Sequence, residues 1–311
     1  LLFLVFCIMK IFITGGAGFI GIHLCKKLLE LNHDVTVYDN FSNSLRENFD
    51  SEINQKVTVV SGDILDNSKL VTSMKNHDIV IHLAAQISVP ASIKNPKLTF
   101  DVNVNGTQNV LNACLQNNIT KIIAASTAAV YRNTSTKIIL DEASPVEPQS
   151  PYGQSKLEME NKIIDFASIH NIDATILRFF NVFGIGQSLE YAGVITKFKE
   201  NIQNNSSLII FGDGTVTRDF VHVDDIVDAI ILAIPNLKNS IYNIASGVST
   251  SISNLAETMI AISGKDIKII YQPSRPGDIL FSAADISLAK ETLKFTPKIF
   301  LKNGLEQLMS E

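Results

Sequence analysis

One short run of glycines constrains the fold of this chain more than any other feature. The run Thr14-Gly15-Gly16-Ala17-Gly18-Phe19-Ile20-Gly21 follows an apolar, strand-like segment, residues 10–14, and precedes an amphipathic helical stretch, residues 19–31. In that setting Gly15 permits a tight turn, Gly18 lets the backbone approach a pyrophosphate, and Gly21 lets helix and strand pack closely. Glycines also mark ordinary turns, so it is their place between a strand and a helix that predicts a dinucleotide site.

Short apolar runs alternate with helical patterns up to about residue 180. The strand-like runs are residues 10–14, 34–38, 57–60, 78–83, 121–125 and 174–178, and the helical stretches are 19–31, 66–76, 98–117 and 153–170. Apolar runs without strict alternation suit strands that are covered on both faces. The pattern therefore predicts an α/β fold: a doubly wound parallel (Rossmann) sheet with a smaller α/β C-terminal substrate lobe.

The pattern becomes irregular after residue 180, where Gly, Asn and Pro cluster around residues 184–193, 203–214 and 272–278. We expect the Rossmann domain to comprise residues 9–178 plus about 218–245, and the lobe about 179–217 plus 246–311. Residues 1–8 are apolar but too few to span a bilayer, which takes roughly 20 apolar residues. They also lack the basic region and cleavage site of a signal peptide. We expect Met9 to be the natural start and residues 1–8 an upstream extension.

Composition excludes several classes of protein. Apolar residues make up 46% and charged residues 18% of the chain, a balance typical of a compact enzyme rather than a disordered protein. The net charge is −5 and there is no basic block, which argues against nucleic acid or an anionic membrane as a partner. The three cysteines have no CxxC spacing, which favours reduced thiols in a cytoplasmic protein and predicts no metal site.

The ends of the next strands extend the predicted nucleotide site. Asp39 ends the second strand about 20 residues beyond the glycines, where a carboxylate accepts from both ribose hydroxyls and repels a 2′-phosphate, so the predicted cofactor is NAD rather than NADP. The same residue could cap the following segment, and the two roles can coexist. Asp63 and Ile64 follow the third strand, where adenine would be held. The fourth strand ends in Leu83, Ala84, Ala85 and Gln86, whose small members allow close approach of the cofactor.

A tyrosine and a lysine supply candidate chemistry. Tyr152 and Lys156 stand four residues apart in Ser150-Pro151-Tyr152-Gly153-Gln154-Ser155-Lys156, so a helix would present both from one face. A phenol titrates near 10, and a nearby ammonium pulls that pKa toward neutrality, where general acid–base catalysis works best. A lone pair with this spacing is more often a surface tyrosine beside a solvated lysine. The glycine run and Asp39 favour the catalytic reading.

Taken together, these motifs resemble the extended short-chain dehydrogenase/reductases, and within them the UDP-glucose 4-epimerase-like members of the NAD-dependent epimerase/dehydratase family. The resemblance covers nearly everything from Met9 onward. Besides the motifs above it includes Asp39-Asn40 with Asn43-Ser44, Gly62-Asp63-Ile64, His82 to Gln86, Asn103 to Thr107, Ser126 to Tyr131, Arg178 to Val182 and Thr217 to Asp225.

The resemblance implies the following site residues. The catalytic triad would be Thr127, Tyr152 and Lys156, with Thr127 bonding the reacting sugar oxygen and Lys156 also reaching the nicotinamide ribose. Further residues would bind NAD (Gly15, Gly18, Phe19, Ile20, Gly21, Asp39, Asn40, Asn43, Ser44, Asp63, Ile64, Leu83, Ala84, Ala85, Gln86 and Asn103) or the UDP-sugar (Ser88, Thr127, Asn181, Arg218, Arg275, Asp278 and Ser282). Guanidinium groups suit phosphates because they present paired donors.

The residues after Thr127 discriminate between reactions in the resembled family. Related 4,6-dehydratases carry an Asp-Glu pair there, and decarboxylating relatives carry a Glu two places on, whereas this chain has Ala128 and Ala129. Alanines cannot transfer protons, so the resemblance implies 4-epimerisation of a UDP-hexose through a transient 4-keto sugar. Ser282 stands where a bulky aromatic marks members restricted to plain hexoses, which favours acceptance of UDP-GlcNAc and UDP-GalNAc unless Phe281 fills the gap.

The sequence leaves three alternative functions open, and the resemblance implies an oligomeric state. A reductase making a net redox change, or another sugar-nucleotide oxidoreductase of the same family, would use the same residues. A non-catalytic NAD-sensing protein would be expected to lose the tyrosine or the lysine, and both are present here. The resemblance also implies a homodimer, in which the helices around residues 98–117 and 153–170 pair with a second copy.

Overall fold

The computed structural model describes residues 8–45, 47, 49, 51–133, 138–187, 193–274 and 280–311. The chain divides into two compact units, each described below by itself. Unit 1 comprises the described residues up to Ser126 with Ser150–Leu177 and Ala233–Ile241. Unit 2 comprises the described residues of Thr127–Gln149, Arg178–Leu232 and Tyr242–Glu311. The sequence-based division into a Rossmann domain and a lobe stays a prediction.

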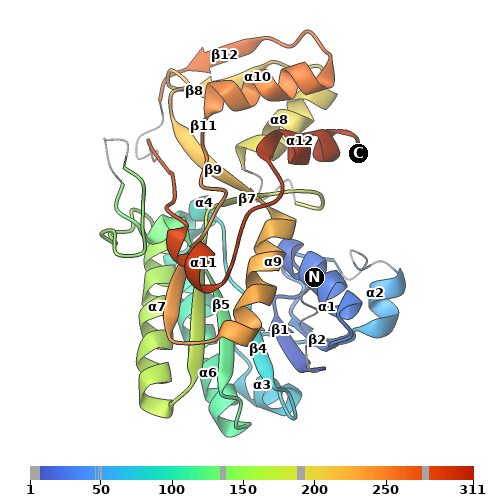
Figure 1. The fold of residues 1–311 in the computed structure, drawn as a ribbon, viewed down its shortest axis with the longest axis vertical. Coiled ribbons are helices and arrows are strands. Elements are labelled where there is room, and N and C mark those ends of the chain that lie inside the picture. The colour runs from blue at the N-terminus through green and yellow to red at the C-terminus, as the bar shows by residue number, and fades with distance from the viewer. Residues whose placement is uncertain are drawn as a thin grey trace. The chain divides into compact units, whose positions relative to one another are not determined.

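A seven-stranded sheet carries the nucleotide-binding motifs (Figure 1). Its order is β10-β6-β5-β4-β1-β2-β3, so the chain reverses direction across the sheet between β1 and β4. The strands are β1 (Lys10–Thr14), β2 (Asp34–Asp39), β3 (Thr58–Ser61), β4 (Ile79–His82), β5 (Lys121–Thr127), β6 (Asp173–Phe179) and β10 (Ser240–Ile244). Parallel pairing sets Ile11 opposite both Val35 and Ile79. The doubly wound α/β prediction is therefore confirmed, with β10 as a strand that the apolar pattern did not reveal.

The helices of unit 1 follow the predicted stretches, with two differences. They are α1 (Phe19–Glu30), α2 (Ser51–Lys56), α3 (Asn67–Ser73), α4 (Val89–Lys94), α5 (Pro96–Phe100), α6 (Thr107–Gln116) and α7 (Pro151–His170). The predicted helix 98–117 is α5 and α6 joined by a π-helical turn, η2 (Asp101–Gly106). The short α2 and α4 were not predicted. The N-cap of α4 is Ser88, whose hydroxyl accepts a hydrogen bond from the Ala91 amide at 3.1 Å.

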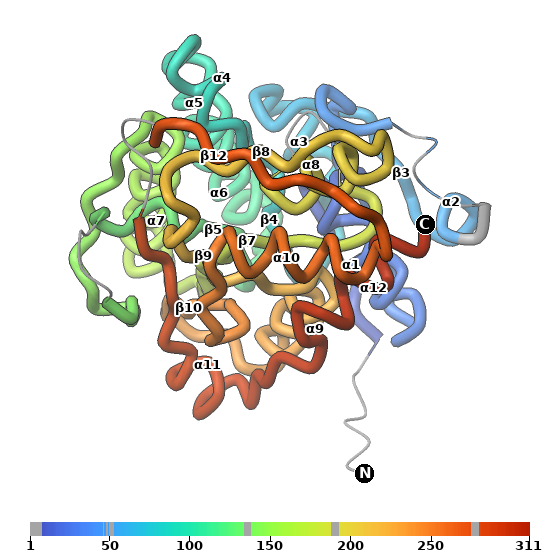
Figure 2. Tube along the Cα trace, turned by 90° about the horizontal axis from the view of Figure 1, so that it is seen from above, coloured from blue at the N-terminus to red at the C-terminus, as the bar shows by residue number. Residues whose placement is uncertain are grey.

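Apolar side chains from alternate strand positions bury one face of this sheet. Phe12, Val80 and Ile122 meet Leu111 of α6 and Met159 of α7 in a single buried cluster. The view in Figure 2 places α3 and α6 on one side of the strands and α1 on the other. Burial on both faces explains why the strands read as continuous apolar runs in the sequence.

Unit 2 is built from two small sheets and five helices among the described residues. One sheet has the order β11-β9-β7, parallel between β7 and β9 and antiparallel between β9 and β11, and the other pairs β12 with β8 in parallel. The strands are β7 (Asn181–Phe183), β8 (Leu208–Phe211), β9 (Thr217–His222), β11 (Ser249–Ser251) and β12 (Ile269–Gln272). The helices are α8 (Val194–Gln203), α9 (Val223–Ala233), α10 (Ile252–Ser263), α11 (Ser287–Thr292) and α12 (Leu301–Met309). Apolar side chains of α8, α10 and α12 share one core with β8 and β9.

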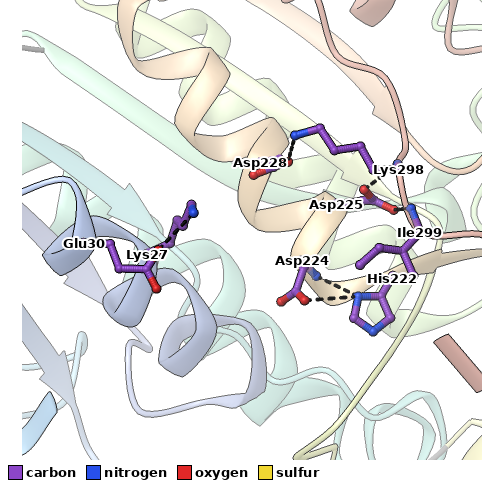
Figure 3. Close-up of polar contacts among 8 residues, drawn as sticks. All are labelled: Lys27, Glu30, His222, Asp224, Asp225, Asp228, Lys298 and Ile299. Atoms are coloured by element: carbon purple, nitrogen blue, oxygen red, sulfur yellow. Dashed lines mark hydrogen bonds and ion pairs between the residues drawn. The ribbon is translucent and has the colours of Figure 1, made fainter. Parts of the chain in front are cut away.

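Carboxylates at the start of α9 hold the segment that leads into α12 (Figure 3). Asp225 accepts from the amides of Lys298 at 2.8 Å and Ile299 at 3.2 Å, and the Lys298 ammonium pairs with Asp228 at 2.5 Å. His222 Nδ1 accepts from the Asp224 amide at 3.2 Å, so this histidine caps the start of the helix. These contacts are structural and lie within unit 2.

In the portion of the chain that the structure covers, every helix is too short or too polar to cross a bilayer.

The first turn of the glycine run has almost no free space. Gly15 adopts a left-handed conformation with φ of 70°, and its amide donates to the Tyr38 carbonyl at 2.9 Å. A Cβ on Gly15 would lie 2.5 Å from the Ala84 nitrogen, whereas one on Gly18 would meet its nearest neighbour, the Gly15 carbonyl oxygen, at 3.3 Å. Gly18 itself has an ordinary φ of −75°. The fold itself therefore requires Gly15, and also Gly21, where a Cβ would lie 2.5 Å from the Gly16 carbonyl oxygen, whereas it does not require Gly18 in the absence of a ligand.

We predict that Gly15→Ala lowers the free energy of unfolding by about 3 kcal/mol, since it combines left-handed backbone strain with overpacking against β-strand backbone. Gly18→Ala, the matched control in the same loop, should cost less than about 1 kcal/mol. Urea unfolding without added nucleotide measures both. Equal losses in the two variants would contradict this account of the turn.

Candidate active site

The glycine turn leads into a helix N-terminus that suits an anion. Gly18 is the N-cap of α1 and makes no side-chain capping bond, and the first turn of the helix carries no acidic residue. The Ile22 amide returns to the Gly18 carbonyl at 3.0 Å, which starts the helical ladder. The amides of the preceding positions and the positive end of the helix dipole are thus directed toward the carboxyl edge of the sheet. This is the geometry that a pyrophosphate requires.

Asp39 lies at the end of β2, and its carboxylate organises the surrounding loop. It accepts from the amides of Ala17 at 3.0 Å and Phe41 at 2.8 Å and from the Ser44 hydroxyl at 3.3 Å. One carboxylate therefore links the glycine turn to the loop after β2. The capping role that the sequence allowed is present in the structure, and a role toward ribose hydroxyls stays a prediction.

Asp63 and Asn40 meet where the third strand ends. The Asn40 amide donates to the Asp63 carboxylate at 2.9 Å, and the Leu65 amide donates to its other oxygen at 2.8 Å. Ile64, between them, is buried in the core beneath the sheet edge. The predicted adenine-binding residues are therefore neighbours in space, while their contact with a base stays a prediction.

Asn103 fixes the loop after β4. Its side-chain oxygen accepts from the Gln86 amide at 2.7 Å, and its nitrogen donates to the Gln86 carbonyl at 3.1 Å and to the Ser155 hydroxyl at 2.9 Å. The side chain is only 1% exposed, and its hydrogen-bonding capacity is used by the protein itself. It joins the β4 loop to α7, which is a role that the sequence did not indicate.

One orphaned atom beside Asn103 fits a bound cofactor. The Gln86 side-chain oxygen is buried and lacks a hydrogen-bond partner within the described residues. Buried acceptors are rarely left unsatisfied in native proteins, so this oxygen marks a place where a ligand or a water would donate. Together with the cradle at Gly15 and Gly18, it shows that unit 1 suits a dinucleotide.

Tyr152 and Lys156 lie in the first two turns of α7. Ser150 caps this helix by accepting from the Gly153 amide at 3.1 Å, and Pro151 occupies its first position. The Tyr152 amide donates to Ser92 of α4 at 3.1 Å, which ties the helix start to the neighbouring helix. The pair therefore stands on one face of a helix whose N-terminus is held from two sides.

Lys156 is buried at the carboxyl end of the sheet. The side chain is 3% exposed, and its ammonium donates to the Ala125 carbonyl of β5 at 2.7 Å and lies 3.1 Å from the Met159 sulfur. Burial lowers the pKa of Lys156 to about 8, while the Glu160 carboxylate acts in the opposite direction. A cation held in this way can polarise a neighbouring hydroxyl and orient a ribose.

Two of the predicted sugar-nucleotide residues, Asn181 and Arg218, share a cavity in unit 2. Asn181 and Arg218 line a cavity of about 290 Å³ together with Gln187, Val194 and Phe211. The Asn181 nitrogen donates to the Asp219 carbonyl at 3.0 Å, and Arg218 donates to the Thr217 carbonyl at 2.8 Å. The cavity combines apolar walls with three polar side chains, the amides of Asn181 and Gln187 and the guanidinium of Arg218. The sequence missed its apolar lining, which comes from β7, β8, β9 and α8 and shows no motif.

The other predicted substrate-binding residues differ in their burial and hydrogen bonds. Thr127 ends β5, and its hydroxyl accepts from the Ala129 amide at 3.2 Å. Ser282 is 6% exposed, and Ser88 caps α4. Arg275 and Asp278 lie outside the described residues, as do residues 1–7.

A buried polar network follows Thr127 along the chain and was not predicted. Arg178 donates to the Tyr131 hydroxyl at 3.0 Å and lies over its ring, 4.8 Å from the centroid. The Tyr131 hydroxyl donates to Asn243 at 2.6 Å, and the Asn243 amide donates to the Glu142 carboxylate at 2.7 Å. The network fixes the segment in which Ala128 and Ala129 lie. Its members come from four separate parts of the chain, so no local pattern could have revealed it.

Comparisons with known proteins agree with this geometry. The model of the NAD dependent epimerase/dehydratase family matches residues 11–245. The chain belongs to this family. A putative UDP-glucose 4-epimerase of Methanocaldococcus jannaschii is 39% identical over 304 residues, covering 96% of this chain and 97% of the relative. The family accounts for the NAD site and for the seven-stranded fold.

Solved structures of family members extend the comparison. The UDP-glucose 4-epimerase of Thermotoga maritima with UDP-glucose is 34% identical, with a TM-score of 0.92 and coverage of 97% of this chain and 98% of that one. The UDP-N-acetylglucosamine 4-epimerase of Methanobrevibacter ruminantium with UDP-N-acetylmuramic acid is 35% identical, with a TM-score of 0.93 and 98% of both chains covered.

Other family members perform different reactions. A UDP-N-acetyl-alpha-D-glucosaminuronate decarboxylase of Bacillus cytotoxicus is 30% identical, covering 95% of each chain. The family thus fixes an NAD-dependent enzyme that modifies sugar nucleotides, and the particular reaction must be argued from individual residues.

We predict that Asn103→Ala lowers the free energy of unfolding by about 2 kcal/mol and weakens NAD binding, since it leaves two backbone groups of Gln86 unsatisfied. The matched control is Asn105→Ala, which removes an exposed asparagine bonded to Asp101 from the same π-helical turn. Urea unfolding and NAD titration measure the two effects. Wild-type NAD affinity in Asn103→Ala would show that the β4 loop needs no such support.

Proposed function

We propose that this protein is an NAD-dependent 4-epimerase of a UDP-hexose. The observation that carries the proposal is Lys156, a buried cation one helical turn from Tyr152, combined with alanines at the two positions after Thr127. The first feature supports proton and hydride transfer at a sugar hydroxyl. The second leaves no acid or base at the positions from which dehydratases and decarboxylases of the resembled family act.

The proposed mechanism assigns proton transfer to Tyr152. Its phenolate accepts the proton of the sugar 4-hydroxyl as C4 is oxidised to a ketone, and returns the proton once the opposite face of the sugar has been reduced. Lys156 holds the phenolate in its ionised form through its positive charge. Thr127 positions the reacting oxygen with its hydroxyl. Inversion at C4 requires the keto sugar to turn between the two steps, so binding must hold the nucleotide and leave the hexose mobile.

NAD, when bound, supplies the acceptor and donor of hydride. The residues that would hold it are the Gly15–Gly18 turn at the pyrophosphate, Asp39 at the adenosine ribose and Lys156 at the nicotinamide ribose. The orphaned Gln86 oxygen lies at the loop that would face it. Net redox change is zero in an epimerase, so this binding should be tight and permanent.

The unit 2 cavity is proposed as the uridine diphosphate site. Asn181 and Arg218 present an amide and a guanidinium to phosphates, and Val194, Phe211 and Val216 give a base an apolar wall. Arg275 and Asp278, outside the described residues, are proposed to complete the site. If the protein holds only the nucleotide, the hexose has no fixed contacts. The keto sugar can then turn between the two steps, which inversion at C4 requires.

For the sugar, we propose that N-acetylated hexoses are accepted, with UDP-Glc and UDP-Gal as further substrates. Ser282 is small where the resemblance associates a bulky aromatic with plain hexoses. The similarity to the UDP-N-acetylglucosamine 4-epimerase of Methanobrevibacter ruminantium supports the same choice.

Two properties of the assembly accompany this proposal. A homodimer would cover apolar side chains that α5, α6 and α7 expose, among them Leu98, Leu115 and Ile164, each at least 42% exposed. The cytoplasm is proposed as the location, because UDP-sugars and reduced thiols belong to that compartment. A reductase is the alternative within the family, and release of free NADH during turnover would favour it.

We predict that Tyr152→Phe lowers kcat at least about a hundredfold, because the phenol is the proton carrier, while NAD remains bound. Turnover of UDP-sugars without added NAD measures the first effect and protein-bound NAD the second. The exposed Tyr271→Phe serves as the matched control and should keep full activity. Substantial residual turnover in Tyr152→Phe would remove Tyr152 from its assigned role.

The sugar preference gives a further prediction. The wild-type protein should epimerise UDP-GlcNAc at least as well as UDP-Glc, since Ser282 leaves room for the acetamido group, and comparison of kcat/KM for the two substrates measures this. Phe281→Ala is the informative variant. If UDP-GlcNAc turns over only after that substitution, Phe281 fills the gap and the proposed substrate range is wrong.

A further inference from the structure

A buried carboxylate lies one helical turn beyond Lys156 and has no part in the mechanism so far. Glu160 is 1% exposed, on the face of α7 that packs against β5. The Ser126 hydroxyl donates to its carboxylate, and the Lys156 ammonium donates to the carbonyl of Ala125, the preceding residue of β5. The two charged side chains of the helix are thus hydrogen-bonded to consecutive residues of one strand, Ala125 and Ser126.

Because both side chains are buried, the charge of Lys156 and the charge of Glu160 stabilise each other. An ammonium removed from water loses several kcal/mol of hydration, and one carbonyl and one thioether sulfur restore only a part of it. An acid and a base at i and i+4 of one helix are neighbours on its surface, and in a dry interior their attraction is much stronger than in water. A glutamate in this position would otherwise be as costly as the lysine.

We propose that Glu160 is the counterion that keeps Lys156 protonated, and thus a positioning residue for the catalytic Tyr152–Lys156 pair. The part that concerns catalysis rests on the proposed function. Ser126 holds the carboxylate in place, so β5 sets the distance between the two charges. Glu160 touches neither substrate nor cofactor in this assignment and acts through Lys156 alone.

The other charged groups around Lys156 do not replace Glu160. His82 of β4 is bonded to Thr14 at 2.6 Å and Thr107 at 2.9 Å, and burial together with the Lys156 charge lowers its pKa to about 3, so it stays neutral. The elements packed against α7 carry few other charged residues. Lys94 of α4 and Lys97 of α5 are exposed, whereas Asp101 of η2 and Lys121, at the far end of β5, are half-buried. Helix α6 has no charged residue. The Glu160 carboxylate raises the pKa of Lys156 against the effect of burial.

Glu160→Gln tests the proposal, because the amide keeps the shape and an acceptor for Ser126 but removes the charge. The NMR signal of the Lys156 13Cε nucleus, assigned with Lys156→Arg, follows lysine ionisation without any need for catalysis. We expect its titration midpoint to fall by about one pH unit in Glu160→Gln, and to stay at the wild-type value in Glu158→Gln, which removes an exposed carboxylate from the same helix. Equal midpoints in all three proteins would overturn the proposal.

Two further readouts separate this inference from the proposed function and from simple misfolding. The alkaline limb of the kcat–pH profile should move to lower pH in Glu160→Gln, and a uniform loss of kcat at every pH would show a merely structural role. A protein inactive on UDP-sugars would defeat the proposed function and leave the lysine titration as the test. Should Glu160→Gln not fold, the 13Cδ signal of Glu160 in the wild-type protein is the test. If Glu160 is ionised at every pH at which Lys156 is protonated, the pairing is supported. If Glu160 is protonated at those pH values, the proposal is overturned.

Discussion

The burial of one ammonium group at the end of a parallel sheet is the constraint on which the rest of the site depends. Lys156 reaches the strand edge only because α7 packs closely along β5. Its charge is tolerated there only because polar groups of the protein contact it. The same burial brings the lysine pKa within reach of neutral pH. A solvated lysine would be held less firmly and would influence a neighbouring phenol less, since water screens its charge.

The parallel sheet explains why the candidate cofactor residues converge. In a doubly wound fold all strands deliver their C-terminal residues to one edge, and ligands bind there where the strand order changes direction, which in this sheet is between β1 and β4. Gly15, Asp39, Asp63 and Gln86 follow four different strands of this sheet. Hydrogen bonds from the Ala17 amide of the glycine turn to Asp39, and from the Gln86 amide to Asn103, then hold these strand ends in fixed positions. Catalytic position is thus set by strand order, and its precision by a few buried polar side chains.

The sequence predicted the fold well because its signals are local. Strand ends such as Thr14 and Asp39, and the start of α7 after Ser150, carry propensities and capping residues that can be seen within a few positions. The π-helical turn at Asp101–Gly106 has no such signal, because it extends a helical pattern by changing only its hydrogen bonding. The network of Arg178 with Tyr131 and Asn243 depends on contacts between residues far apart in the chain. Glu160 could have been found, since a glutamate four residues after Lys156 on the apolar face of a helix is a conflict that needs a partner.

In the proposed function, the residues next to Thr127 decide the reaction type, because the fold and the cofactor are common to the family. Oxidation at a sugar C4 makes the neighbouring C–H bonds acidic, so that a nearby acid and base would favour elimination of water; in a sugar acid, the same ketone lets the carboxyl group leave as CO2. Ala128 and Ala129 provide neither an acid nor a base. The buried contacts of Arg178 with Tyr131 hold the turn that carries these alanines, so backbone rearrangement cannot easily bring another polar group into their place. In the proposed epimerase, a turn that carries no acid or base leaves the ketone to be reduced, from one face or the other.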